Sequence, residues 1–224
     1  MCSATRALPH VVVLISGAGT NLQAIIHQQQ TGQLPLKLCA VLCNRPSATG
    51  LRHAHPAGIP THIIDHTAYP TRETFDHALM AVIDSYEPDL VVLAGFLRIL
   101  TPGFVQHYLG RLLNIHPSLL PRHPGLNTHL AALNGGDTEH GATVHFVTDE
   151  LDGGPRVLQA RLKINPEESA ASLASRVLEY EHQIYPLVIK WFAQGRLRLS
   201  PKGVSLDGKI LANVLQFDPE NPDS

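Results

Sequence analysis

Five consecutive apolar residues and a glycine loop make up the stretch that decides the fold, Val11-Val12-Val13-Leu14-Ile15-Ser16-Gly17-Ala18-Gly19-Thr20-Asn21. A continuous apolar run of this length is typical of a strand that is buried on both faces of a parallel sheet. Leu22, Ile25 and Ile26 follow at helical spacing. The stretch therefore predicts a strand, a tight glycine turn and a helix, which is the first unit of an α/β fold.

Apolar strands and helices continue to alternate over the next hundred residues. A helix is predicted from about 72 to 86, because Phe75, Leu79, Val82 and Ile83 form one apolar stripe. Further strands are predicted over 36–43, 61–64, 89–95 and 112–116. This order favours a parallel sheet with helices covering both faces.

The last third of the chain has a different pattern. Residues 142–148 alternate in character, and a second strand over 156–164 follows the turn Asp152-Gly153-Gly154-Pro155, which predicts an antiparallel pair. A long helix is predicted from about 168 to 192, and a loose edge from Leu197 onward. We expect one domain over residues 1–224, with 1–9 and 218–224 as flexible tails.

The composition restricts the class of protein. The chain has 224 residues, 44% of them hydrophobic, and a formal charge of −2, which argues against a nucleic-acid-binding surface. No apolar run approaches the roughly 20 residues that span a membrane, and the run after Met1–His10 is too short for a signal peptide. Cys2, Cys39 and Cys43 form no paired framework. We expect a reduced, cytoplasmic protein.

The glycine loop has only part of the dinucleotide-binding fingerprint. Leu22 stands where the third glycine would fall, and the first carboxylate of the chain is Asp65, too late to hold a ribose in that motif. The backbone N–H groups of Gly19, Thr20 and Asn21 at a helix N-terminus would suit one phosphate. The alternative is a structural turn in which Thr20 or Asn21 caps the helix.

Asn114 and His116 lie at the end of a predicted buried strand and share one face, because strand side chains alternate. An amide and an imidazole placed together can hold a developing oxyanion and transfer a proton. Histidine is frequent, with 14 residues, and the spacing of His116, His123, His129, His140 and His145 matches no common zinc pattern, so we expect no metal site. We expect His123 and His140 in surface loops, while His145 suits either the core or the site.

Two carboxylates have competing interpretations. Asp152 occupies a glycine-rich turn where aspartate is common for conformational reasons, but it could also fold over His116 and favour the protonated imidazole. Glu181 falls on the apolar stripe of the long helix, where an unpaired charge would cost several kcal/mol. It therefore reaches a polar partner in a cleft, pairs with an arginine such as Arg176, or lies exposed at the helix edge.

Together these residues resemble the phosphoribosylglycinamide formyltransferases of purine synthesis, from Val11 to about Leu197. The core Asn114-Ile115-His116-Pro117-Ser118-Leu119-Leu120-Pro121 is shared by formyltransferases in general, whereas the Ser16–Asn21 loop and Gly125-Leu126-Asn127-Thr128-His129 are typical of the glycinamide ribonucleotide branch. Two further matching segments are 91–100 and 145–155. The resemblance implies a Rossmann-like open twisted sheet, mostly parallel with an antiparallel C-terminal part.

The resemblance also implies a reaction, the transfer of a formyl group from 10-formyltetrahydrofolate to the amine of 5′-phosphoribosylglycinamide. Asn114, His116 and Asp152 would be catalytic, with no metal. Gly19, Thr20 and Asn21 would bind the nucleotide phosphate, and Glu181 the ribose hydroxyls. The residues implied for folate binding are Arg72, Leu97, Arg98, Ile99, Leu100, Asn114, Thr148, Asp149, Glu150, Leu151 and Asp152.

The chain departs from its relatives at Leu97, where many have Met, and at Leu178, where a polar residue is common. The competing functions are methionyl-tRNA formyltransferase, formyltetrahydrofolate hydrolase and a non-catalytic nucleotide binder. We expect no further C-terminal domain and no basic surface for tRNA, and the ten or so residues before the first strand are too few for a regulatory domain. Small-molecule substrates are expected, with no nucleic acid or membrane partner, in a monomer or homodimer.

Overall fold

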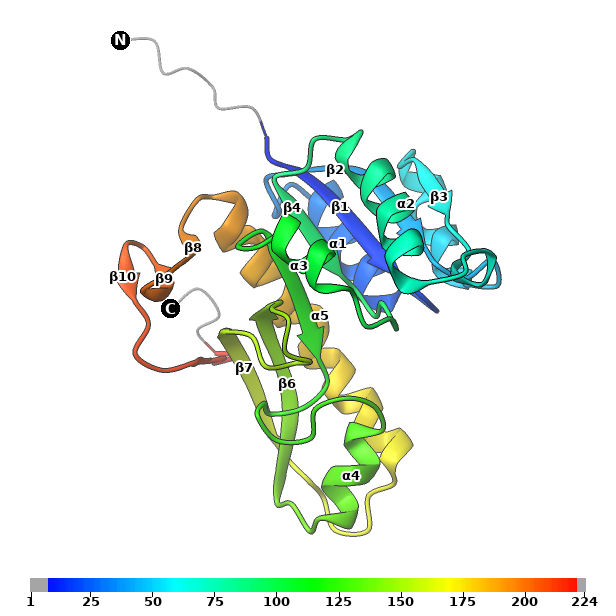
Figure 1. Cartoon of the computed structure of the whole chain (residues 1–224). Helices are drawn as coiled ribbons and strands as arrows, with labels where there is room; N and C mark the ends of the chain where they lie inside the picture. Colours follow the sequence, from blue (N-terminus) through cyan, green and yellow to red (C-terminus); the bar gives the residue numbers. More distant parts are fainter. Residues whose placement is uncertain (1–7, 221–224) are drawn as a thin grey trace.

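The computed structural model describes residues 8–220, which form an eight-stranded sheet covered by helices and a small three-stranded sheet (Figure 1). The strand order of the large sheet is β11-β7-β6-β5-β4-β1-β2-β3. Its strands are β1 (His10–Ile15), β2 (Lys37–Cys43), β3 (Thr61–Ile63), β4 (Leu90–Leu93), β5 (Leu112–His116), β6 (Glu139–Phe146), β7 (Arg156–Lys163) and β11 (Leu215–Gln216). The mostly parallel α/β architecture expected from the sequence is confirmed.

β1 lies in the centre of the parallel part of the sheet. It pairs with β2 on one side and β4 on the other, and β3 and β5 extend the parallel arrangement outward. From β1 the chain first builds outward to β3 and then returns to form β4 and β5 on the opposite side of β1. The order of strands therefore reverses between β1 and β4, and ligands of open α/β sheets bind at the carboxyl ends of the strands beside such a point.

The helices cover both faces of the sheet because side chains of a strand alternate between them. Val11, Val13 and Ile15 belong to one apolar core with α1 (Thr20–Gln30) and α5 (Ala170–Ala193). Val12 and Leu14 belong to the second core, with α2 (Arg72–Asp84) and α3 (Pro102–His107). Each fully buried aliphatic side chain contributes about 1.5–3 kcal/mol relative to exposure, so this single strand anchors both layers.

The expected antiparallel part is confirmed. β6 pairs antiparallel with both β5 and β7, and the turn with Asp152 lies between β6 and β7. In the register of β5 and β6, Asn114 lies opposite His145 and His116 lies opposite Thr143. A further short helix, α4 (Thr128–Asn134), follows β5 and contacts α5.

The expectation of a loose edge after Leu197 is wrong. The chain forms a small antiparallel sheet of β8 (Leu197–Ser200), β9 (Gly203–Leu206) and β10 (Lys209–Ile210), and β11 then adds a parallel strand beside β7. Asp207 and Gly208 both have positive φ in the hairpin between β9 and β10, which is a common two-residue turn. The strands are two to four residues long, too short for a periodic apolar pattern.

The outer parts of the expected tails, 1–7 and 221–224, lie outside the described residues. Among residues 8–220, no helix is both long and apolar enough to cross a membrane.

Candidate active site

The segments that follow β1, β4 and β5 meet at the carboxyl edge of the sheet. They are the glycine loop after Ile15, the segment 94–101 after β4, and the end of β5 with Asn114 and His116. The turn 147–155 between β6 and β7 also lines this region, since Val147 to Asp152 share a pocket with Asn114. Residues far apart in the sequence are therefore brought together at the strand reversal.

His116 and Asp152 lie side by side. The Nδ1 atom of His116 is 3.4 Å from Oδ2 of Asp152, and its Nε2 atom is 2.9 Å from the carbonyl oxygen of His123. Because a carbonyl oxygen only accepts hydrogen bonds, Nε2 carries the hydrogen of that bond. The second nitrogen, Nδ1, faces the carboxylate of Asp152.

A glycine at position 154 allows the turn that carries Asp152 to close. A Cβ atom on Gly154 would lie 1.8 Å from the carbonyl oxygen of Phe146, so a side chain there would force the backbone apart. Asp152 itself has a φ of 52°, and its Oδ2 accepts the backbone N–H of Gly125 at 2.8 Å. The aspartate is thus a turn residue and also faces the imidazole, so the two interpretations of the sequence are compatible.

Asn114 contacts a second histidine, His145, whose place the sequence left open. The Nδ2 atom of Asn114 is 3.2 Å from Nε2 of His145, and Nδ1 of His145 is 3.0 Å from the carbonyl oxygen of Phe146. Nδ1 must therefore donate, which leaves Nε2 as the acceptor for the amide of Asn114. Burial lowers the pKa of His145 to about 4, so the ring is neutral at pH 7 and can keep this acceptor.

The Ser118-Leu119-Leu120-Pro121 run is held by a buried polar network. Thr143 Oγ1 donates to the carbonyl oxygen of Ser118 and accepts the N–H of Leu120, at 2.7 and 3.1 Å. Gln159 donates to the carbonyl oxygen of Leu120 at 2.8 Å. Because these groups are satisfied inside the protein, the chain beyond His116 has a defined path.

The expectation that His140 lies in a surface loop is wrong. His140 is 1% exposed in β6, and its Nε2 atom lies 3.1 Å from Nδ1 of His129. His123 is half-buried in a loop and its ring contacts Asp137 at 2.7 Å. Burial lowers the pKa of His140 to about 4, with His129 and His123 contributing in the same direction. Both faces of β6 are covered, which the alternating sequence did not reveal.

The glycine loop turns sharply into α1. Gly19 precedes the helix in the left-handed conformation, with φ of 69°, and a Cβ atom there would lie 2.9 Å from the Cα of Gly50. No side chain caps the helix, so the alternative in which Thr20 or Asn21 is the capping residue is wrong. The first N–H groups of a helix have no intrahelical partner, and groups of this kind can stabilise an anion.

Glu181 joins the glycine loop to α5. It is 8% exposed, and its Oε2 atom accepts a hydrogen bond from Nδ2 of Asn21 at 2.7 Å. Burial raises the pKa of Glu181, while the bond from Asn21 partly offsets that shift. The suggested partner Arg176 instead contacts Glu168 at 2.7 Å, and exposure at the helix edge is excluded.

A pocket lined by both apolar and polar side chains lies beside Asn114 at the same edge. Its walls are the segment after β4 and the turn between β6 and β7, with Leu93, Phe96, Arg98, Ile99, Leu100, Val105, Asn114, His145, Val147, Thr148, Asp149, Glu150, Leu151 and Asp152. Nine of the eleven residues expected at the folate site line it. The other two, Arg72 and Leu97, do not: Arg72 is exposed at the start of α2, and the side chain of Leu97 is half exposed.

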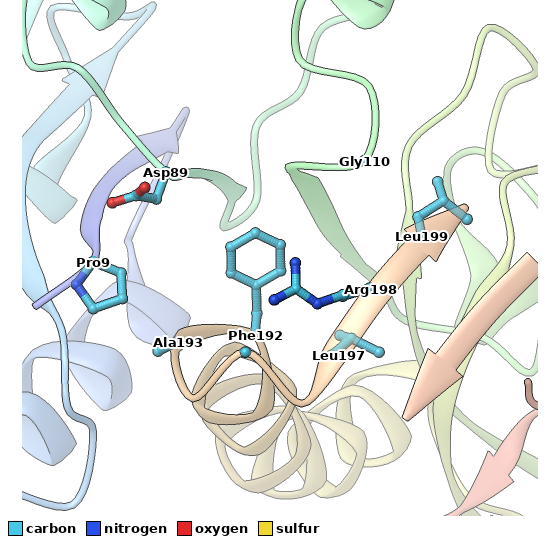
Figure 2. A pocket seen from close by; sticks show the side chains of 9 residues that line it. Pro9, Asp89, Gly110, Phe192, Ala193, Leu197, Arg198 and Leu199 are labelled. Atoms are coloured by element: carbon cyan, nitrogen blue, oxygen red, sulfur yellow. The ribbon is translucent and has the colours of Figure 1, made fainter. Parts of the chain in front are cut away.

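A larger cavity of about 260 Å³ lies at the opposite edge of the sheet (Figure 2). Pro9, Asp89 and Gly110 line it from the residues just before β1, β4 and β5, and Phe192 and Arg198 line it from the C-terminal part. Ligands of open α/β sheets bind at the carboxyl ends of the strands, whereas this cavity lies at their amino ends. The pocket beside Asn114 is therefore the better candidate for the active site, although it is smaller. Within residues 8–220, no three His, Cys, Asp or Glu side chains gather as metal ligands would.

The fold and this edge of the sheet define a class of protein. Residues 9–189 match the family model described as formyl transferase, and the chain belongs to that family. The phosphoribosylglycinamide formyltransferase of Escherichia coli is 54% identical over 90% of this chain and 95% of its own length. That of Haemophilus influenzae is 49% identical over the same shares. The structure of the Coxiella burnetii phosphoribosylglycinamide formyltransferase superposes with a TM-score of 0.90 at 53% identity, covering 94% of this chain and all of the other.

Proposed function

We propose that this protein transfers the formyl group of 10-formyltetrahydrofolate to the amine of 5′-phosphoribosylglycinamide in purine synthesis. One observation carries the proposal: Asp152 lies 3.4 Å from His116 and lines one pocket with Asn114, at the carboxyl edge of the sheet from which the glycine loop also starts. Similarity to the two bacterial phosphoribosylglycinamide formyltransferases supports this pair of substrates.

The nucleotide would bind across the glycine loop and α5. The backbone N–H groups of Gly19, Thr20 and Asn21 would hold the phosphate at the positive end of α1. Glu181 would accept hydrogen bonds from the ribose hydroxyls. The hydrogen bond between Asn21 and Glu181 supports this assignment, because it holds the carboxylate of Glu181 beside the N-terminus of α1, where the phosphate would bind.

The folate would lie in the pocket beside Asn114. Arg98, Ile99 and Leu100 supply one wall, with backbone groups that can read the polar edge of the pterin, and Thr148 to Asp152 supply the other. Leu97 and Arg72 would contact the parts of the folate that extend beyond the pocket, with Arg72 near the glutamate tail. The guanidinium of Arg98 lies 5.5 Å from the ring centre of Phe75 on α2, the helix that begins with Arg72, which supports a shared surface.

Asn114 would stabilise charge on the formyl oxygen. One N–H of its amide is directed to His145, so the second would donate to that oxygen as the amine attacks the formyl carbon. Neutral His145 fixes which way the amide points, and it is therefore a positioning residue. His116 would provide a second donor to the same oxygen through Nδ1, the nitrogen that is not bonded to the carbonyl oxygen of His123.

Asp152 would contact His116 and help to move one proton. The attacking amine loses a proton as its bond to the formyl carbon forms, and the leaving nitrogen of the folate gains one as its own bond breaks. Asp152 and His116 would relay that proton, directly or through a water molecule, so no net charge is left in the site. Their 3.4 Å separation supports this role.

We further propose that residues 1–224 act as a single domain, with small molecules as the only substrates, in the cytoplasm and as a monomer or homodimer. Cys39 and Cys43 are both buried and unpaired, which supports a reducing compartment.

Donor consumption tests the function directly. A spectrophotometric assay with 10-formyltetrahydrofolate is run with and without phosphoribosylglycinamide, and we expect consumption only with the ribonucleotide. Consumption without it would assign the chain to the hydrolases. Saturable nucleotide binding with no consumption would identify a non-catalytic binder, and formylation of methionyl-tRNA would identify the tRNA enzyme.

A further inference from the structure

The carbonyl oxygen of His123, which accepts the Nε2 hydrogen of His116 at 2.9 Å, belongs to a residue with an unfavourable backbone conformation. The φ of His123 is 52°, in the left-handed region, and Pro124 follows it. Residues other than glycine rarely adopt this region, and a residue before proline favours an extended backbone. Such a conformation persists only where the surrounding contacts hold it in place.

Asp137 provides the contact that holds the side chain of His123. Its Oδ2 atom accepts a hydrogen bond from Nε2 of His123 at 2.7 Å, and the side chain of Asp137 is only 9% exposed. The backbone N–H of Asp137 donates to the carbonyl oxygen of Ala132, in the last turn of α4, at 3.1 Å. Asp137 is thus fixed by α4, outside the short loop 122–125 that carries His123.

The residues on either side of His123 are held by other groups. Oγ of Ser118 donates to the carbonyl oxygen of Arg122 at 2.7 Å, and the N–H of Gly125 donates to Asp152 at 2.8 Å. Both contacts lie outside the peptide that joins His123 to Pro124. Because proline has no N–H, the carbonyl directed at His116 is the one hydrogen-bonding group of that peptide. The contact with Asp137 is therefore the one that holds His123 through its own side chain.

We infer that Asp137 is a positioning residue, which holds the ring of His123 so that the carbonyl oxygen of His123 stays directed at Nε2 of His116. The inference rests on the proposed function, in which His116 acts through Nδ1. Without Asp137, the backbone of His123 is free to relax toward negative φ, and its carbonyl turns away from His116. The imidazole then loses the contact that fixes its orientation beside Asp152.

Steady-state kinetics of Asp137→Ala test the inference. We expect kcat to fall by about tenfold, the effect of losing one hydrogen bond that orients a reacting group. The KM for phosphoribosylglycinamide should not change, because the glycine loop and Glu181 are untouched. Asp137→Asn should restore most of kcat, since its amide oxygen still accepts the Nε2 hydrogen of His123. A purely structural role would lower Tm without separating kcat from KM.

Arg122→Ala is the matched control. The guanidinium of Arg122 also contacts the carboxylate of Asp137, and its side chain is half exposed. This substitution removes one partner of Asp137 but leaves the contact with His123 in place. We expect kcat to stay at the value of the unmodified protein. Equal losses in Arg122→Ala and Asp137→Ala would reduce Asp137 to a structural role.

The imidazole N–H of His116 provides a measurement that needs no turnover. His116 is 6% exposed, and its Nε2 hydrogen is bonded to the carbonyl oxygen of His123, so this hydrogen should exchange slowly with water. In protein labelled with ¹⁵N-histidine it should give an NMR signal, assigned by its absence in His116→Ala. We expect the signal in the unmodified protein, in Arg122→Ala and in Asp137→Asn, and its loss in Asp137→Ala.

An unchanged kcat or an intact Nε2 signal in Asp137→Ala would overturn the inference. If Asp137→Ala does not fold in a thermal melt, His123→Gly removes the ring that Asp137 holds, while glycine still adopts positive φ. The same losses of kcat and of the Nε2 signal are then expected. Failure of the proposed function gives a different result, since the unmodified protein would transfer no formyl group while the Nε2 signal still shows whether Asp137 orients His116.

Discussion

The carboxylate of Asp152 lies 3.4 Å from the imidazole of His116, and the same carboxylate oxygen accepts the backbone N–H of Gly125 at 2.8 Å. The second contact ties Asp152 to the loop that follows β5. The position of Asp152 beside His116 is therefore fixed by a backbone hydrogen bond. His116 is in turn bonded to the carbonyl oxygen of His123 in that loop. The orientation of the imidazole is thus set on both sides.

Replacing His116 by alanine should nearly abolish formyl transfer, with a loss of about 10²–10⁴ in kcat, because a donor and a proton relay are removed together. Nucleotide binding should change little, since the glycine loop and Glu181 are untouched. Steady-state kinetics and calorimetry with phosphoribosylglycinamide measure the two effects. Turnover close to that of the unmodified protein would remove His116 from the mechanism.

Asp152→Asn should lower kcat by about 10²–10³ while the fold is retained. The new side chain can still accept the N–H of Gly125, but it cannot take up a proton from the attacking amine. The measurement is kcat together with calorimetry of phosphoribosylglycinamide binding, which we expect to be retained. An unchanged kcat would mean that Asp152 is only a turn residue.

His145→Phe should lower kcat by about tenfold, which corresponds to the loss of one neutral hydrogen bond that orients Asn114. The KM for the nucleotide should stay the same. His140→Phe is the control, because His140 is also a buried histidine of β6 but contacts His129 instead of Asn114. Equal effects of both substitutions on kcat would point to general disruption of β6.

Glu181→Gln should weaken nucleotide binding and stabilise the protein. Burial raises the pKa of Glu181, so the folded state favours the protonated form, and stability is lost as pH rises above the ordinary pKa of 4.5. At pH 7 a neutral glutamine should therefore raise Tm. Affinity for phosphoribosylglycinamide should fall at least about tenfold, since a charged acceptor is lost. A stable variant with unchanged affinity would contradict the ribose assignment.

The protein should lose stability on mild acidification. The pKa values of His140 and His145 are lowered to about 4 by burial, from the ordinary 6.5, so between these values the unfolded chain binds more protons than the folded one. These two histidines therefore lower the free energy of unfolding as pH drops from 6.5 toward 4, and we expect them to outweigh Glu181, whose raised pKa acts in the opposite direction. Thermal melts should show Tm lower by roughly 5 °C or more at pH 5 than at pH 7. The decrease should be smaller in His140→Phe; a pH-independent Tm would contradict the assignment.

Local pattern was sufficient to predict much of the fold. Val11 to Ile15 is apolar at every position because both faces of β1 are covered, and the stripe of Phe75, Leu79 and Ile83 appears because one face of α2 packs on the sheet. Glu181 interrupts a similar stripe, which made it visible as a polar residue that needs a partner. Asn114 and His116 were recognisable because two polar groups end a buried strand.

The sequence by itself thus determined strands β1 to β7, the helices α1, α2 and α5, the glycine turn and the types of residue available for chemistry, since each depends on neighbours a few positions away. Only the tertiary structure decided that Asn21 is the partner of Glu181, that His145 orients Asn114, and that Asp137 holds the ring of His123. These pairs join different elements of the sheet, and their proximity depends on strand order and register. No local spacing encodes that information, because it arises when the elements pack around a common core.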